Sequence, residues 1–153
     1  MDIGIDAKTR KKIAGSLEQV LSDTYALYTK THTYHWNIEG PRFGQLHTLF
    51  ETQYNELWLA LDSIAERIRS LGHYAPALET AGAKSSIKAD SGSPAEDQML
   101  GNLASGNEAV VKSARAALKA AEDAGDQASA DLMTQRVAIG EKAAWMLRAH
   151  LAK

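Results

Sequence analysis

Apolar residues recur along this chain with the three- and four-residue spacing of amphipathic helices. The first stripe predicts a helix over about residues 9–36, and its apolar positions are Ile13, Leu17, Val20, Leu21 and Leu27. The second stripe predicts a helix over about 42–71, with Phe43, Leu46, Phe50, Leu57, Leu61, Ile64 and Ile68 on its apolar side. Each predicted helix is about 30 residues long, a length that favours a helical bundle.

The second half of the chain predicts another helix pair. Residues 72–93 are rich in Gly and Ser and long enough to cross a bundle from end to end, and Pro76–Ala81 suits one short helix. The next helix should begin with Ser93 as its N-cap, Pro94 at N1 and Glu96 at N3, and should run to about Ala124. A fourth long helix is expected over about 127–151. This order predicts an all-α, ferritin-like four-helix bundle that forms a single domain over residues 1–153.

Composition narrows the chemistry that this bundle can perform. The chain has 153 residues, of which 44% are hydrophobic and 24% charged, and it contains no cysteine. Disulfides, thiolate metal sites and cysteine nucleophiles are therefore excluded. The net charge of −2 provides no overall attraction to nucleic acid. We find no signal peptide and no apolar run of about 20 residues. We therefore expect a protein without a membrane span, either free in the cytoplasm or associated with the nucleoid.

Side chains that bind metals project from one side of the second predicted helix. At about 100° per residue, Glu51, Asp62 and Glu66 lie about 40°, 60° and 100° around the axis from His47. A helix rises about 1.5 Å per residue, so Glu51 and Asp62 are about 16 Å apart. Bonds to a shared metal are only about 2 Å long. One copy of this helix therefore cannot close one metal site.

Two copies of the helix, packed antiparallel about a two-fold axis, remove this difficulty. Because the centre of the set lies between residues 56 and 57, His47 and Glu51 would face Asp62 and Glu66 of the partner subunit. Two equivalent intersubunit sites would result. Imidazole and carboxylate groups suit iron, manganese or zinc.

Two further residues belong to this hypothesis. Trp58 would lie near the two-fold axis, and His35, near the end of the first helix, could join as a ligand. A di-iron centre inside one bundle is not expected, because none of the five histidines has Glu three residues earlier. In the alternative interpretation, the i,i+4 pairs His47–Glu51 and Asp62–Glu66 only decorate a solvated face, and the polar side serves dimerisation without metal.

The segment HWNIEGPRFGQLHTLFE, followed by LDSIAERIRSLG, resembles the signature of the Dps family, the ferritin-like DNA-binding proteins from starved cells. The resemblance covers residues 31–72 and implies a hollow dodecamer. It implies that this dodecamer oxidises Fe(II) with hydrogen peroxide or dioxygen, with a preference for peroxide. It also implies that the dodecamer stores the ferric mineral and protects DNA from oxidative damage.

The resemblance also implies the roles of individual residues. The ferroxidase ligands would be His35, His47 and Glu51 from one subunit, and Asp62 and Glu66 from its two-fold mate, with Trp36 and Trp58 beside the iron. Glu51 departs from the family pattern, since many members carry Asp there, and its longer side chain could alter the metal spacing.

Asp126 and Asp131, around the start of the fourth helix, resemble the carboxylates of the family's three-fold ion pore. Asp123 is a weaker candidate for the same role. The alternative for Asp126 and Asp131 is helix capping.

DNA contact is the other property that the resemblance raises. Its candidate surface is a basic cluster at the start of the first helix, Lys8, Arg10, Lys11 and Lys12, which an oligomer would repeat many times. A solvated helix end is the alternative, and no long Lys-rich tail is present in the sequence. The competing function is thus a DNA-condensing protein whose metal site is secondary.

Overall fold

A computed structural model describes residues 1–152, and this part of the chain is helical, without strands. The helices, in chain order, are α1 (Ala7–Asn37), α2 (Phe43–Ser70), α3 (Leu78–Gly82), α4 (Glu96–Asp123) and α5 (Gln127–Ala149). The predicted all-α bundle is confirmed, including the short helix in the crossover.

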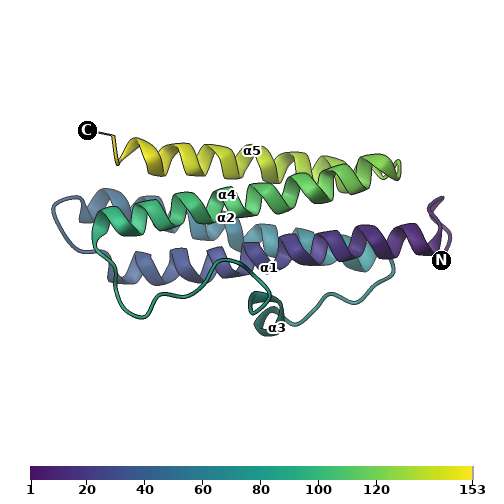
Figure 1. Ribbon diagram of the computed structural model, residues 1–153, viewed down its shortest axis with the longest axis horizontal. Helices are drawn as coiled ribbons and strands as arrows, with labels where there is room; N and C mark the ends of the chain where they lie inside the picture. The colour runs from purple at the N-terminus through teal and green to yellow at the C-terminus, as the bar shows by residue number, and fades with distance from the viewer. Residues whose placement is uncertain (153) are drawn as a thin grey trace.

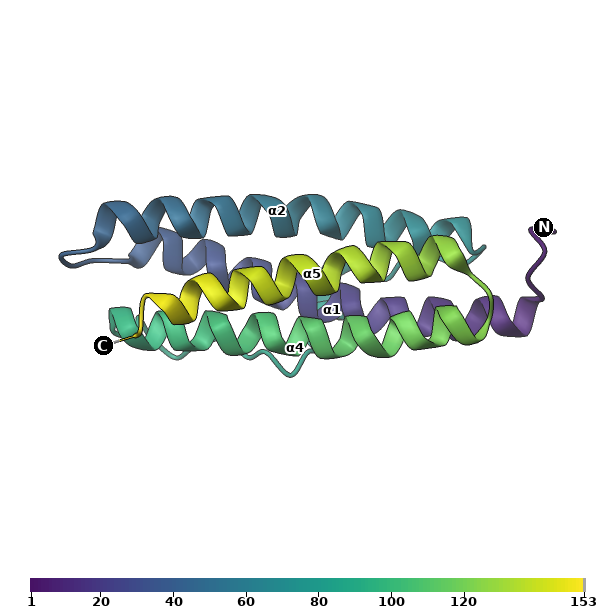
Figure 2. The same ribbon diagram turned by 90° about the horizontal axis from the view of Figure 1, so that it is seen from above.

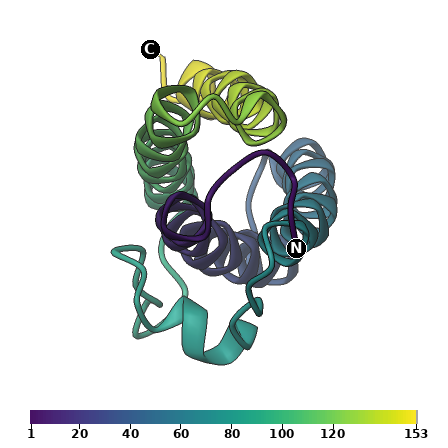
Figure 3. The same ribbon diagram turned by 90° about the vertical axis from the view of Figure 1, so that its right-hand side faces the viewer.

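The four long helices form two antiparallel pairs, α1 with α2 and α4 with α5 (Figure 1). The pairs meet mainly where α4 packs on α1, while α5 touches α2 only lightly. The crossover from α2 to α4 runs along the outside of the bundle, and its helix α3 lies against α1 (Figures 1 and 3). This topology leaves α2 along one edge of the bundle (Figure 2).

Several helix ends follow local rules. The carboxylate of Asp6 caps α1 by accepting hydrogen bonds from the backbone N–H groups of Lys8 (2.9 Å) and Thr9 (3.0 Å). Gly72 follows α2 and Gly125 follows α4, with φ of +87° and +70°. These left-handed conformations end a helix at low cost only when the residue is glycine.

The predicted start of α4 is wrong by two residues. Ser93 is not its N-cap; Ala95 occupies that position, no side chain caps the helix, and the first helical residue is Glu96. The physical reason is a tertiary contact, because the Glu96 carboxylate binds the guanidinium of Arg42 rather than turning back to Ser93. An ion pair with a distant residue has overridden the local capping pattern.

The core contains the predicted apolar stripes. The α1 positions from Ile13 to Leu27 and the α2 positions from Leu46 to Ile68 are buried, as the periodicity predicted. Phe43 is the exception, since it is 46% exposed. It is the first residue of α2 and its ring lies 5.0 Å from the ring of His47, at the edge of the bundle rather than inside it.

Polar contacts fasten the crossover to α1. The Ser85 hydroxyl donates to Asp23 over 2.7 Å, and the ammonium of Lys30 and the hydroxyl of Tyr34 both bind Asp90, over 2.6 and 2.5 Å. These bonds hold a segment with few apolar anchors along the outside of α1. None of the helices in residues 1–152 combines the length and apolarity that a membrane span needs.

Arg42 ties together the end of the bundle where α1 turns into α2. Its guanidinium binds Glu96 and Asp97 (2.5 Å to Asp97) and donates to the backbone carbonyl of His150 over 2.8 Å. One side chain thus joins the α1–α2 connection to the start of α4 and to the end of α5.

Candidate metal centre

The connection of residues 38–42 turns the chain back so that the end of α1 faces the start of α2. It brings His35 and His47 together, with ring centroids 3.7 Å apart and ring planes at 21°. Gly40 allows the turn, because its φ of +116° is strained for any residue with a side chain. The sequence-based expectation that His35 joins the ligand set of α2 therefore has a geometric basis within one chain.

The two histidines hold each other through reciprocal hydrogen bonds. Nδ1 of His35 donates to the backbone carbonyl of His47 over 2.8 Å, and Nδ1 of His47 donates to the carbonyl of His35 over 2.9 Å. A carbonyl oxygen can only accept, so each ring carries its proton on Nδ1. In the neutral ring, Nε2 then keeps its lone pair, which is the form that binds a metal ion.

Aromatic rings surround this pair on the α1–α2 side. Tyr54 lies edge-on to His35 at 5.2 Å and stacks on His32 at 4.0 Å. His32 also lies 4.1 Å from Trp36, and its Nδ1 is hydrogen-bonded to the Tyr28 hydroxyl at 3.2 Å. Burial, followed by the neighbouring His35, lowers the pKa of His32, which favours a neutral ring beside the candidate ligands.

His32 was not among the residues that we predicted from the sequence. Its signal was present, since His32 and His35 are spaced i,i+3 and so share one face of α1. A search limited to Glu-x-x-His motifs passes over it.

The three carboxylates of the predicted set lie on the exposed side of α2. Glu51 is one helical turn from His47, and the side chains of Glu51, Asp62 and Glu66 form no hydrogen bond or ion pair with other groups of residues 1–152. Most other acidic groups in the bundle have such partners. Free carboxylates in this position are available to a cation or to a second chain.

One chain does not bring the two halves of the set together. Asp62 is 11 residues beyond Glu51, which is about 16 Å along a helix. Among residues 1–152, no three His, Asp or Glu side chains are grouped closely enough to hold one metal ion. The arrangement is therefore two separate half-sites, one with two histidines and one with two carboxylates.

An apolar surface separates the half-sites. Trp58 is 54% exposed and Leu59 is 69% exposed, although Trp58 also contacts the Tyr28 ring at 5.4 Å. A cavity of about 270 Å³ next to them is bounded by Asp62 and by Pro76 and Leu78 of the crossover. Exposed apolar side chains of this size beside polar ligands are typical of a protein–protein interface.

Asp126, at the corner between α4 and α5, has the capping role that we gave as the alternative to a pore. It is 3% exposed, caps α5 through the backbone N–H of Ser129 (3.2 Å) and pairs with Arg67 (2.7 Å). Burial alone would raise the pKa of Asp126, but the hydrogen bonds from Ser129 and Arg67 outweigh it and lower the pKa.

The other two acidic residues of this corner are exposed. Asp131 accepts a hydrogen bond from the Gln135 amide over 2.8 Å, and Asp123 pairs with Lys119 over 2.9 Å. A pore role for Asp123, Asp126 or Asp131 needs further subunits, and it stays a prediction.

Comparisons with known proteins agree with this architecture. The family model of the ferritin-like domain matches residues 14–153. A DNA protection during starvation protein of Brevibacillus brevis is 34% identical over 91% of this chain and 94% of its own length. A low-temperature-induced protein of Nostoc sp. is also 34% identical, over 99% of this chain and 86% of its own.

Among solved structures, the Dps protein of Vibrio cholerae superposes with a TM-score of 0.92 at 32% identity, over 98% of this chain and 95% of its own. That protein is described as a member of the ferritin-like diiron-carboxylate superfamily. With the helix order, the crossover and the paired histidines between α1 and α2, these matches show that the chain belongs to the Dps family of ferritin-like proteins.

Proposed function

We propose that this protein is a mini-ferritin that oxidises Fe(II) at sites shared by two copies of the chain. The observation that carries the proposal is a pair of half-sites. One half contains His35 of α1 and His47 of α2, whose Nε2 atoms are free. The other contains the unpaired carboxylates of Asp62 and Glu66, which begin about 22 Å along α2 from His47. Antiparallel pairing of two α2 helices would place the carboxylates of one chain at the histidines of the other.

Each site would then contain His35, His47 and Glu51 of one subunit with Asp62 and Glu66 of the partner subunit. Trp58 and Leu59 would be covered by the same contact, which removes exposed apolar surface from water. Iron is the substrate here; zinc and manganese accept the same ligands and would compete for the site.

The proposed reaction uses hydrogen peroxide as the oxidant. Two Fe(II) ions each give one electron, the O–O bond breaks, and two protons complete two water molecules. Three carboxylates stabilise the positive charge of the metal ions, and the neutral imidazoles supply nitrogen ligands without adding charge. Taking two electrons from two neighbouring ions avoids the one-electron reduction of peroxide that releases hydroxyl radical.

Storage of the ferric product in a dodecameric shell, and protection of DNA from oxidative damage, are part of the same proposal. The support is the membership of the Dps family and the high structural similarity to the Vibrio cholerae Dps protein. Sizing of the purified protein tests the assembly, and a monomer that oxidises iron at the normal rate would contradict it.

Mixing two inactive variants tests whether a site is shared between chains. His47→Ala and Asp62→Ala are each expected to slow oxidation by about 100-fold in the homo-oligomer. In a mixed dimer one site receives both lesions and the other receives neither, so random 1:1 co-refolding should restore activity in about a quarter of all sites. If the ligands acted within one chain, mixing would restore nothing.

The matched control is Glu122→Ala, which removes an exposed carboxylate of α4 outside the candidate site. Its rate of iron oxidation should equal that of the unmodified protein. The rate at which ferric absorbance appears after addition of Fe(II) and peroxide is measured for the unmodified protein, the three variants and the co-refolded mixture.

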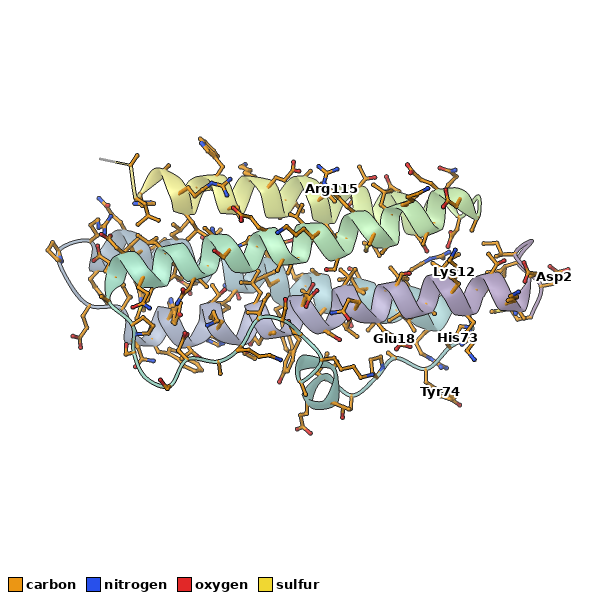
Figure 4. All side chains as sticks on the ribbon, viewed as in Figure 1. Asp2, Lys12, Glu18, His73, Tyr74 and Arg115 are labelled. Atoms are coloured by element: carbon orange, nitrogen blue, oxygen red, sulfur yellow. The ribbon has the colours of Figure 1, made fainter. Side chains whose placement is uncertain are left out.

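DNA binding is a second candidate function. Lys8, Lys11 and Lys12 are exposed at the N-terminal end of α1, where Figure 4 labels Lys12, and they form no ion pair with residues 1–152. A curated relative carries the name DNA protection during starvation protein. We expect weak binding that disappears between low and physiological salt in a gel-shift assay, and that Lys11→Glu with Lys12→Glu abolishes. Binding that persists in this variant would place the DNA contact elsewhere.

A further inference from the structure

A cavity of about 270 Å³ lies between α2 and α5, where these helices touch only lightly, and its floor reaches α1 and α4. It contains none of the candidate metal ligands. Engineered apolar cavities of about 150 Å³ hold a benzene ring, so this one has room for a six-membered ring. Much of its wall is apolar, supplied by Leu49, Leu57, Val110, Ile139, Ala143 and Met146.

The same cavity contains polar groups that the protein leaves without partners. Gln53 is 8% exposed, and neither the oxygen nor the nitrogen of its side-chain amide has a hydrogen bond within residues 1–152. Thr24 is fully buried, and its hydroxyl also lacks a partner there. These are three of the five such buried atoms in the described chain, and all three belong to residues of one cavity wall.

Unpaired groups of this kind are costly. Burying an amide or a hydroxyl without a hydrogen bond destabilises a protein by about 1–3 kcal/mol per group. Residues 1–152 provide no partner, so the partner is either water or another molecule in the cavity.

The charges around the cavity decide what kind of molecule fits. Arg136 is buried at the wall, but Glu56, beside it, is its ion-pair partner. This pair carries no net charge, and the remaining charge on the wall is that of Lys142, whose side chain is exposed to solvent. A carboxylate could only accept hydrogen bonds, and it would face the Gln53 carbonyl oxygen and Glu56. A hydroxyl both donates and accepts, and it matches the Gln53 amide and the Thr24 hydroxyl together.

We propose that this cavity binds a small neutral amphiphile, an apolar ring or short chain that carries a hydroxyl. The hydroxyl exchanges hydrogen bonds with Gln53 and Thr24, and the apolar body contacts the leucine, valine and methionine side chains of the wall. This site is independent of the proposed metal centre and does not depend on iron.

Phenol and toluene are the probes, because they share a shape and differ in the hydroxyl. The four methionines provide the readout, since only Met146 lines the cavity and the Met133 side chain is buried elsewhere in the core. In methyl NMR of the assembled protein, phenol should shift the Met146 signal saturably and leave Met133 in place. Toluene should bind about tenfold more weakly, the equivalent of one hydrogen bond.

Gln53→Met removes the amide and keeps the size of the side chain. Phenol should then bind about tenfold more weakly, whereas toluene should bind as well as before or better. Equal binding of phenol to the variant and to the unmodified protein would overturn the proposal, and so would the absence of a saturable Met146 shift.

A second pair of variants tests the location. Ala143→Leu places a larger side chain in the cavity and should abolish phenol binding, while Ala138→Leu, on an exposed side of α5, should leave it unchanged. Phenol binding that survives in Ala143→Leu overturns the assignment to this cavity.

Discussion

The two halves of the α2 ligand face differ in how far the chain has already organised them. At the N-terminal half, His35 and His47 stack and exchange hydrogen bonds with each other's backbone, so their rings are oriented without metal. At the C-terminal half, Asp62 and Glu66 are exposed and have no partner within residues 1–152. The fold of a single chain organises the first half, whereas no contact within residues 1–152 organises the second.

This difference has an energetic meaning. Groups that are oriented in advance lose little entropy when they bind an ion, whereas free carboxylates must be ordered at that moment. The same imidazole contacts also join α1 to α2, so ligand geometry and fold stability are coupled at the histidine half. At the carboxylate half, the geometry of the side chains and the stability of the fold are independent of each other.

The largest expected effect comes from removing one side chain from each half and comparing both the oxidation rate and the thermal midpoint. His35→Ala and Asp62→Ala should each slow iron oxidation by about 100-fold, because each removes a proposed ligand. Only His35→Ala should also lower the thermal midpoint, by several degrees, since a buried side chain is lost and the His47 carbonyl loses its donor. Calorimetry at equal protein concentration measures this contrast, and equal midpoints for the two variants would refute it.

The α4–α5 corner offers a similar comparison, between the buried carboxylate of Asp126 and the exposed carboxylate of Asp131. Asp126→Asn should cost about 2 kcal/mol of unfolding free energy, because the cap of α5 and the pair with Arg67 both weaken. Asp131→Asn, at an exposed position, should change stability by less than about 0.5 kcal/mol. A slower iron uptake in Asp131→Asn at unchanged stability would favour the pore role.

The Asp126 contribution should depend on pH in a defined direction. Because the folded state lowers the pKa of Asp126 from its ordinary 3.8, the stabilisation is complete above that value. It is lost as the pH falls through the lower, folded-state pKa. The gap in unfolding free energy between the unmodified protein and Asp126→Asn should therefore narrow below pH 3.8, and a gap that stays constant would contradict the assignment.

Glu51→Asp makes a smaller chemical change at the histidine half of the candidate site. The variant keeps a carboxylate one turn from His47 and shortens its reach by one methylene, so the oxidation rate should change only a few-fold, by roughly 1 kcal/mol. Stability should not change, because Glu51 is exposed. Stopped-flow mixing with Fe(II) and peroxide gives the rate; a complete loss of oxidation would mean that the length of Glu51 is essential.

The smallest effect belongs to a pair that is exposed on both sides. Arg115, labelled in Figure 4, binds Glu141 between α4 and α5 at the surface, over 2.6 Å. Arg115→Ala should change the unfolding free energy by less than about 0.5 kcal/mol, as is usual for solvated ion pairs. A larger loss in thermal denaturation would show that this pair is part of a wider network.

The sequence was sufficient for the helices because apolar periodicity is a local property. Ile13, Leu17 and Leu46 repeat with helical spacing, and the structure buries all three. The start of α4 was not predictable in this way, since Glu96 has its partner in Arg42, 54 residues away. Local capping rules fail where a contact with a residue distant in the sequence stabilises another arrangement more strongly.

For the candidate site, the sequence identified ligand types but not their orientation. The spacing on α2 predicted two half-sites, and the single chain keeps them apart, as helix geometry requires. The mutual hydrogen bonds of His35 and His47 involve backbone carbonyls, whose positions no spacing pattern encodes. The pairing of Asp62 and Glu66 with a second chain stays a prediction.

Arg42 has a consequence for how the bundle opens. One guanidinium holds the start of α4 and the His150 carbonyl, at the end of α5, against the α1–α2 connection. We therefore expect the terminal turns at this end to fray together rather than one at a time. Their amide hydrogens should exchange with solvent together, in one cooperative event, and far more slowly than those of the crossover. The histidine pair lies at this protected end of the molecule.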